Sequence, residues 1–254
     1  MHLSDTLISP AVGATMCAIS LAANVYAVKK IKDGGFSTEK IPLIVATGAF
    51  VFAAQMLNFT IPATGSSGHI VGSILLASII GNLPALLAIS AVLVVQCLFF
   101  ADGGLLALGC NIFNMGVIPC LLVYPLIFNP LVKNGITFKS ITLASIVSAI
   151  ASLQIGAFGV VLETQLSGIT ALPFSKFLSL MQPIHFAIGF AEGIITAAIL
   201  CFVHIYNKRP AITFAIAAVF AGCVLSPFAS TYPDGLEWSI ERTAGSDSFI
   251  LPVR

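Results

Sequence analysis

The start of the chain and two histidines, His2 and His69, have nitrogen atoms of the kinds that bind transition metals. His2 directly follows Met1, so the terminal amine, the His2 peptide nitrogen and a His2 ring nitrogen could close two chelate rings around one divalent ion. These three nitrogens would share one plane, and a fourth could come from His69 in the stretch TGSSGH. Planar coordination by nitrogen suits Ni(II), Cu(II) or low-spin Co(II) better than Mg(II) or Ca(II). A bulky second residue is expected to preserve Met1.

A second polar stretch, at residues 96–115, interrupts apolar sequence and contains Asp102, Asn111 and Asn114. Asn111 and Asn114 are three residues apart and would share a helix face, where they could hold neighbouring helices or a loop in register. Asp102 precedes two glycines, a pattern typical of a turn between spans. Carboxamides are poor ligands for late transition metals, so we expect this stretch to be structural.

A third group comprises His185 and Glu192, which are seven residues apart and therefore on one helix face. Gly189 and Gly193 lie between and beside them and form a small-residue surface for helix packing. One interpretation is a proton relay or a second metal site along a permeation path. The other is a buried polar lock between helices. His204 is expected to be an ordinary interfacial histidine.

The composition predicts an integral membrane protein. Hydrophobic residues make up 58% of the chain and charged residues 8%, with a mean hydropathy of +1.05. A soluble enzyme would need about a quarter charged residues. The net charge of +1 provides no basic face for nucleic acid. Six cysteines lack the paired spacing of a metal site, and the N-terminus lacks the basic region of a secretory signal.

Eight apolar segments predict an all-α polytopic fold. They are residues 8–28, 41–59, 69–81, 84–100, 104–128, 140–162, 178–206 and 211–226. The segment 69–81 is short, so it could be a tilted span or a re-entrant half-helix. After Pro227 the chain becomes polar, which indicates a short extension on the outer side.

The basic residues predict the orientation, because cytoplasmic loops are enriched in Lys and Arg. They gather in three loops: Lys29, Lys30, Lys32 and Lys40; Lys133 and Lys139; Lys208 and Arg209. Eight spans with an extracytoplasmic N-terminus place all three loops in the cytoplasm, and place His2 and His69 together on the outer face. If residues 69–81 were re-entrant, the chain would cross the membrane one time fewer and the later lysines would lie outside. The charges therefore favour a true span.

Four motifs now carry a family resemblance. They are MHLSDTLISP, NFTIPATGSSGH, QCLFFADGGLLALGCNIFNMG and HFAIGFAEGIITA, and they occur in order over residues 1–206. The chain resembles the CbiM/NikM family of cobalt and nickel transport proteins, the substrate-capturing membrane subunits of energy-coupling-factor (ECF) ABC transporters. The later stretch SPFASTYPDGLE resembles an accessory extension that is fused to some members.

The resemblance implies a seven-helix ECF S-component-like bundle in residues 1–206, whose extra N-terminal helix delivers the terminus into the interior. Residues 207–254 would form one additional transmembrane helix and a short extracytoplasmic PDGLE-like tail. A second apolar segment often follows this motif and none precedes Arg254 here, so the role of the tail is left open. The metal ligands would be Met1, through its amine, with His2 and His69.

By the same resemblance, Asp102, Asn111, Asn114, His185 and Glu192 would support the ligands rather than bind the ion. Co2+ or Ni2+ would be the transported substrate, no cofactor would be permanently bound, and cobalamin synthesis is a candidate destination for the metal. The residues leave the choice between cobalt and nickel open. The location would be the prokaryotic plasma membrane.

The chain has no GxxxxGK[ST] loop for ATP, so any ATP hydrolysis would come from a partner. The resemblance implies that the partners are a transmembrane coupling subunit and ATP-binding cassette ATPases. A small accessory membrane subunit and membrane lipid are further expected partners, and nucleic acid is not. Docking could use alanines spaced four apart, at Ala14, Ala18 and Ala22 or at Ala49 and Ala53. Packing within the chain explains these alanines equally well.

Two other classes remain open. An ion-coupled secondary metal transporter would use His185 and Glu192 as coupling groups. An intramembrane enzyme would use Asp102, His185 and Glu192 around a catalytic metal. The chain is otherwise expected to be a transporter subunit and not an enzyme.

Overall fold

The computed structural model is a bundle of long helices with 78% helical content, and it describes residues 1–35, 37–206 and 209–245. The all-α membrane fold is thereby confirmed. Lys208 of the third basic loop lies outside the described residues. The main helices are α1 (Pro10–Asp33), α2 (Ile41–Gln55), α3 (Ser73–Ile80), α4 (Asn82–Phe100), α5 (Leu108–Ile112), the π-helical η3 (Phe113–Phe128), α6 (Asn129–Val132), α7 (Phe138–Ser167), α8 (Phe174–Tyr206), α9 (Pro210–Phe220), the π-helical η4 (Ala221–Leu225) and α10 (Gly235–Ala244). Single 3-10 turns are η1 (Asp5–Leu7), η2 (Thr38–Lys40) and η5 (Ser226–Phe228).

Every predicted apolar segment contains a helix, although the helices differ in length. Within the described residues, six helices are long and apolar enough to cross a membrane. They are Pro10–Asp33, Asn82–Phe100, Leu108–Val132, Phe138–Ser167, Phe174–His204 and Pro210–Phe228. The remaining two, α2 and α3, have 15 and 8 residues. An eight-residue helix is about 12 Å long, so α3 cannot cross a core of roughly 30 Å by itself.

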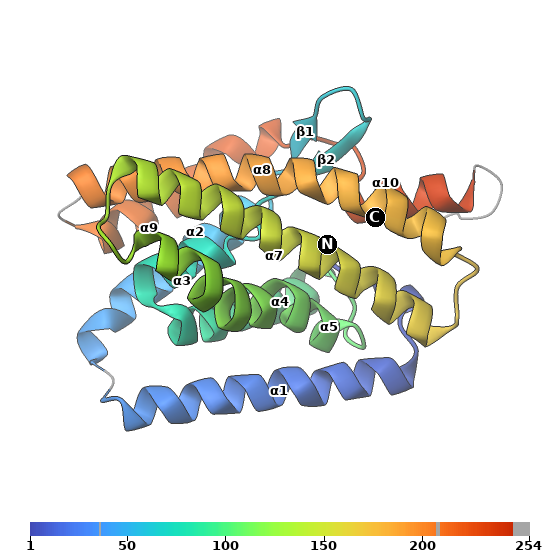
Figure 1. Ribbon diagram of the computed structural model, residues 1–254, viewed down its shortest axis with the longest axis horizontal. Helices are drawn as coiled ribbons and strands as arrows, with labels where there is room; N and C mark the ends of the chain where they lie inside the picture. Colours follow the sequence, from blue (N-terminus) through green and yellow to red (C-terminus); the bar gives the residue numbers. More distant parts are fainter. Residues whose placement is uncertain (36, 207–208, 246–254) are drawn as a thin grey trace.

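A small β-hairpin leads into α3 and was not expected in an all-α chain. Its strands are β1 (Phe59–Ile61) and β2 (Ser66–Gly68), which pair antiparallel with Thr60 opposite Ser67. The turn has a positive φ at Gly65, a conformation that glycine adopts without steric cost. The hairpin projects beyond the helices at one edge of the molecule (Figure 1). His69 directly follows β2, so the hairpin sets its position.

The longest helices, α7 and α8, lie against each other at the predicted small-residue surface. A Cβ atom at Gly193 would lie 2.5 Å from the Ile146 Cα, and one at Gly189 would lie 3.0 Å from the Ile150 Cα. Only glycine allows this close approach of two backbones. The packing role of Gly189 and Gly193 is therefore confirmed.

Two prolines explain the wide helical turns of η3. Pro119 and Pro125 both lie inside this helix. Proline has no N–H to donate and its ring crowds the preceding turn, so the regular i to i−4 ladder cannot continue through it. Wider turns of this kind often mark functional segments, and Asn114 lies in the first turn of η3.

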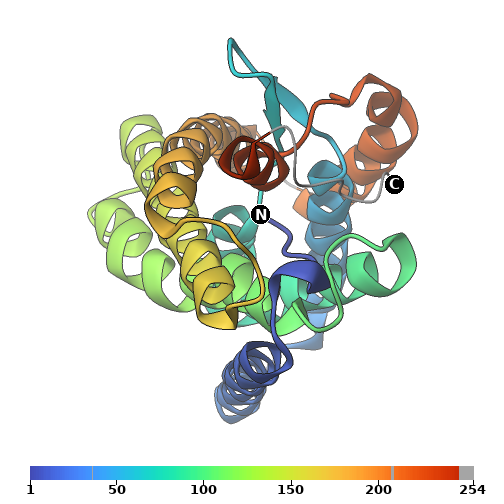
Figure 2. The ribbon, with the colours of Figure 1, turned by 90° about the vertical axis from the view of Figure 1, so that its right-hand side faces the viewer.

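The N-terminus lies in the interior, whereas α1 runs along the outside of the bundle (Figures 1 and 2). Leu3, Leu7 and Ile8 are at most 1% exposed, so burial of these side chains holds the first residues inside. At the other end of the chain, α9 packs against α2 through Phe214 and Phe50, whose ring centroids are 5.3 Å apart.

Candidate metal site

The terminal amine is buried and paired with a carboxylate. The Met1 nitrogen lies 3.4 Å from Asp234 Oδ2, and the side chains of Met1 and Asp234 are 2% and 17% exposed. Asn111 fixes the following backbone, because its Oδ1 accepts from the Leu3 N–H at 2.8 Å and its Nδ2 donates to the Leu3 carbonyl at 3.1 Å. Asn111 therefore positions the first residues, as expected of a supporting residue.

The rings of His2 and His69 lie side by side. Their rings stack with centroids 5.2 Å apart and planes inclined by 22°. The His69 Nδ1 lies 3.0 Å from the Ile70 carbonyl, which can only accept, so Nδ1 carries the proton and Nε2 keeps its lone pair. The structure thus brings together all three of the predicted ligand residues, Met1, His2 and His69.

The polar atoms of His2 are unequally satisfied. Its Nδ1 lies 3.6 Å from Asp102 Oδ1, while its Nε2 is buried without a hydrogen-bond partner among the described residues. Asp102 follows the end of α4 in the predicted turn. A buried polar atom without a partner costs about 1–3 kcal/mol, and such atoms mark functional sites.

Burial keeps both imidazoles neutral. It lowers the pKa of His2 to about 3, against the opposing attraction of Asp102. The pKa of His69 is also lowered, first by burial and then by the terminal ammonium ion. Burial alone would raise the pKa of Asp234, but the ammonium ion and the helix-capping N–H groups outweigh it and lower this pKa. Neutral imidazole is the form that binds metals.

Glu192 holds the backbone that follows His69. Its two carboxylate oxygens accept from the N–H groups of Val71 and Gly72, each at 2.9 Å. Gln55 supports the same loop by donating to the Val71 carbonyl at 2.7 Å, and Gln96 donates to Gln55 Oε1 at 2.7 Å. Glu192 therefore links α8 to residues 69–72, the loop that carries His69. Sequence reasoning did not single out Gln55.

His185 lies close to the same residues, but it binds a backbone group of its own helix and not the loop after His69. Its Nδ1 lies 2.8 Å from the Met181 carbonyl, one turn earlier in α8. It lines a small cavity together with Met1, His69 and Asp234. His185 and Glu192 thus share a helix face, as predicted, but bind different backbone groups.

Asn114 joins two helices through an acidic residue that sequence reasoning missed. Its Nδ2 donates to Glu163 Oε2 at 2.7 Å, which links η3 to α7. An isolated glutamate within an apolar run was the available signal, because ionisable residues at membrane depth are costly and usually paired.

A metal ion at the candidate site would need main-chain nitrogen ligands as well as side chains. No group of three His, Cys, Asp or Glu side chains within the described part of the chain is arranged to hold a metal ion. Asp102, His185 and Glu192 in particular do not form such a group. The terminal amine and the His2 amide are the additional donors that a chain terminus can provide.

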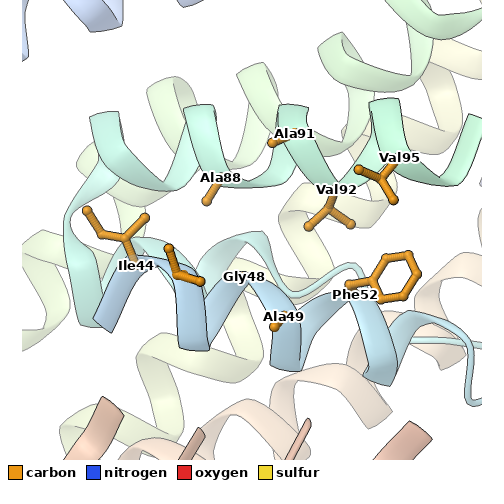
Figure 3. A pocket seen from close by; sticks show the side chains of 9 residues that line it. Ile44, Gly48, Ala49, Phe52, Ala88, Ala91, Val92 and Val95 are labelled. Atoms are coloured by element: carbon orange, nitrogen blue, oxygen red, sulfur yellow. The ribbon is translucent and has the colours of Figure 1, made fainter. Parts of the chain in front are cut away.

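Two cavities of opposite character lie near the bundle. The groove between α2 and α4 is lined by apolar groups, including Ile44, Phe52 and Val92, and offers no side-chain ligand (Figure 3). A smaller cavity of about 140 Å³ reaches His2 and His69. It is also lined by Gln55, Met56, Asn58, Asp102, Asp234 and Glu237. Unlike the apolar groove, this second cavity has the polarity that a cation requires.

The C-terminal segment covers the site, which the sequence did not predict. Asp234 caps α10 in a capping box with Glu237, and the Ser67 N–H donates to the Pro233 carbonyl at 2.8 Å. An acidic residue followed three positions later by glutamate signals a helix start, so the sequence did hold a sign of α10. Within the described residues, the polar tail therefore contains a helix, α10.

The long apolar helices define a multi-pass membrane protein, and comparison with known proteins places it in the transition-metal transport class. Residues 2–212 match the family model described as the cobalt uptake substrate-specific transmembrane region, CbiM. The chain belongs to this family. Residues 208–250 match the PDGLE domain model, so the predicted resemblance to both is confirmed.

Curated relatives and a solved structure agree with this assignment. A protein of Haloquadratum walsbyi named as a putative metal transport protein is 31% identical over 84% of this chain and 94% of its own length. A putative fused nickel transport protein of Archaeoglobus fulgidus is 28% identical over 89% of this chain and 75% of its own. The crystal structure of a truncated transition metal transporter is similar with a TM-score of 0.71 and 27% identity, covering 82% of this chain and all of that one.

Proposed function

We propose that the chain captures Co(II) or Ni(II) at the outer face of the membrane for import. The observation that carries this proposal is the burial of the Met1 amine next to the two imidazoles, beside an opening lined by polar groups. The ligands are the Met1 amine, the amide and ring nitrogens of His2, and His69. A metal that replaces the protons on these nitrogens is bound less tightly as acidity rises.

Each supporting residue has a distinct task in this proposal. Asn111 holds the Leu3 backbone and so orients the chelating terminus, while Glu192 holds the two residues after the His69–Ile70 peptide. Rotation of the stacked rings toward one ion completes the ligand set. Fixing ligands through such contacts raises metal affinity, typically by about 10- to 100-fold per supporting residue.

Import from the captured state requires partners, which we propose to be a coupling subunit and ATPases. The outward face of α1 supports this, because Ala14, Ala18 and Ala22 are all exposed there. On α2, Ala49 is exposed but Ala53 is buried, so the alanines of α1 form the better surface. Small residues allow helices of two membrane proteins to approach closely.

The test is a titration of the purified chain with Co(II) and Ni(II). The native form, with a free Met1 amine, is compared with a form that carries one extra residue before Met1. The extra residue turns the amine into an amide, which should reduce affinity at least 100-fold because a ligand contributes more than a supporting residue. The thermal unfolding of both forms without metal controls for folding.

The outcome discriminates between sites. Tight binding by the native form alone supports capture by the terminus, and the preferred ion then identifies the substrate. Equal binding by both forms would place the metal elsewhere in the chain and would contradict the proposal.

A further inference from the structure

Asp234 uses its two carboxylate oxygens for different purposes. Oδ1 accepts from the N–H groups of Leu236 and Glu237, at 2.9 and 2.8 Å, and so caps α10. Oδ2 points the other way and lies 3.4 Å from the Met1 nitrogen. Capping fixes the carboxylate, so the position of Oδ2 against the terminus is set by the backbone of α10.

The segment that carries Asp234 is anchored on two sides. On the hairpin side, the Ser67 hydroxyl donates to the Tyr232 carbonyl at 2.8 Å, and Trp238 Nε1 donates to the Thr64 carbonyl at 3.0 Å. On the side of α8, Lys176 Nζ donates to the Thr243 carbonyl at 3.0 Å. The hairpin leads directly to His69, so these contacts hold Asp234 and His69 in a common frame.

The distance between the amine and Oδ2 suits two ligands of one ion. Nitrogen and carboxylate ligands lie about 2.0–2.2 Å from a divalent ion such as zinc. At ligand angles between a right angle and a tetrahedral one, two such atoms are therefore about 2.9–3.5 Å apart. The observed 3.4 Å falls in this range.

Asp234 lines two cavities together with the other proposed ligands. The cavity of about 140 Å³ is lined by Asp234, His2 and His69, and a smaller one is lined by Asp234, Met1 and His69. The His2 side chain is only 5% exposed. The carboxylate thus lies among the donors that are expected to converge on the metal.

We propose that Asp234 is a further ligand of the captured ion and binds it through Oδ2. The inference rests on the proposed function, since it places an oxygen beside the nitrogen ligands from Met1, His2 and His69. The C-terminal helix then contributes directly to the site. A carboxylate as fifth ligand moves the geometry away from the planar nitrogen set that favours Ni(II), so Asp234 shifts selectivity toward Co(II).

The experiment compares Asp234→Asn with Glu241→Gln in the full chain. Asparagine keeps the shape and the helix-capping ability of Asp234 but is a poor ligand for these metals. Glu241 is exposed on the same helix, so its variant removes one negative charge without touching the terminus. Co(II) and Ni(II) affinities are measured by calorimetry, and the ligands of bound Co(II) by X-ray absorption.

Asp234→Asn should weaken Co(II) binding by about 10- to 100-fold, weaken Ni(II) binding less, and remove one oxygen from the Co(II) coordination sphere. Glu241→Gln should match the native chain. Native affinity and an unchanged Co(II) spectrum in Asp234→Asn would overturn the inference. Weaker binding with an unchanged coordination sphere would also overturn it, because Asp234 would then act only as a nearby charge.

Two controls separate this inference from the proposed function and from misfolding. If His69→Ala weakens binding while Asp234→Asn does not, only the role of Asp234 fails. If His69→Ala has no effect, the proposed function itself fails. Should Asp234→Asn lower the unfolding temperature, Asp234→Ser provides a second variant, because serine also caps helices.

Discussion

The first eight residues and the helix that follows them differ sharply in their surroundings. Leu3, Leu7 and Ile8 are almost completely buried, and the Leu3 backbone is bound by Asn111. In α1, only 17% of the most apolar window is buried, and the helix lies along the edge of the bundle (Figure 1). The chain thus passes from a segment anchored by buried side chains to a helix that is largely exposed at the edge of the bundle.

The difference separates two proposed roles: the enclosed terminus would bind the metal, and the exposed face of α1 would contact lipid or a partner subunit. α1 is fixed at a close crossing, where the Ser20 hydroxyl donates to the Gly109 carbonyl at 2.7 Å. Its remaining surface is available to lipid or to a partner subunit. Changes in the terminal region should therefore alter metal binding, and changes on the open face of α1 should not.

The largest effect is expected from His69→Ala. Removing one of the proposed nitrogen ligands should weaken Co(II) or Ni(II) binding about 100-fold or more, since even supporting residues contribute about 10- to 100-fold. Calorimetric titration measures the change. His204→Ala is the control, because His204 is exposed at the far end of α8 and should leave the affinity unchanged. A similar loss of metal affinity in both variants would contradict a specific role for His69.

Glu192→Gln should have the next largest effect. The substitution keeps the size of the side chain but replaces one of the two oxygens that accept from the Val71 and Gly72 N–H groups. The loosened loop should lower metal affinity by about 10- to 100-fold. Glu39→Gln, in the exposed 3-10 turn η2, provides the matched loss of charge. Native affinity in Glu192→Gln would show that metal binding does not depend on the hydrogen bonds between Glu192 and this loop.

Acidity should destabilise the enclosed terminus by a smaller amount. The pKa of His2 is lowered from 6.5 to about 3. Between pH 6.5 and pH 3, His2 is therefore protonated in the unfolded chain but neutral in the folded chain. The free energy of unfolding therefore falls as pH falls through this window, by about 2 kcal/mol from pH 7 to pH 5 for this group. Unfolding in detergent, compared between the native chain and His2→Ala, measures it. Equal pH dependence in both would contradict the burial of a neutral His2.

The smallest effect on metal binding is expected from Ala18→Leu. Ala18 is exposed on α1, so the larger side chain should leave metal affinity and unfolding temperature unchanged while reducing association with a coupling subunit. Ala27→Leu is the contrast, because Ala27 is fully buried and overpacking typically costs about 1–3 kcal/mol. Weaker metal binding in Ala18→Leu would mean that the two regions are not separable.

Much of this arrangement could be predicted from local sequence. Apolar length located the helices, and the small-residue spacing of Gly189 and Gly193 located a close contact that the structure confirms. Placing Met1, His2 and His69 on one face depended on counting spans and loop charges, and the structure brings these residues together. Their metal binding remains a prediction.

Other features depend on contacts between distant parts of the chain. Asp234 meets Met1 across 233 positions, a contact that no periodicity can indicate. The hairpin before His69 is too short for a strand pattern to stand out, and its pairing with residues 232–234 stabilises it. Glu163 was visible as an isolated charge, but its partner Asn114 could be identified only from the packing of η3 on α7.

The most direct test of the account is the crystal structure of the full chain grown with Ni(II) or Co(II), with the ion located by its anomalous scattering. The account predicts one strong peak about 2.0–2.1 Å from the Met1 nitrogen, within the same distance of nitrogens of His2 and His69. A peak elsewhere in the bundle, or a bound ion with no contact to the terminal amine, would contradict it.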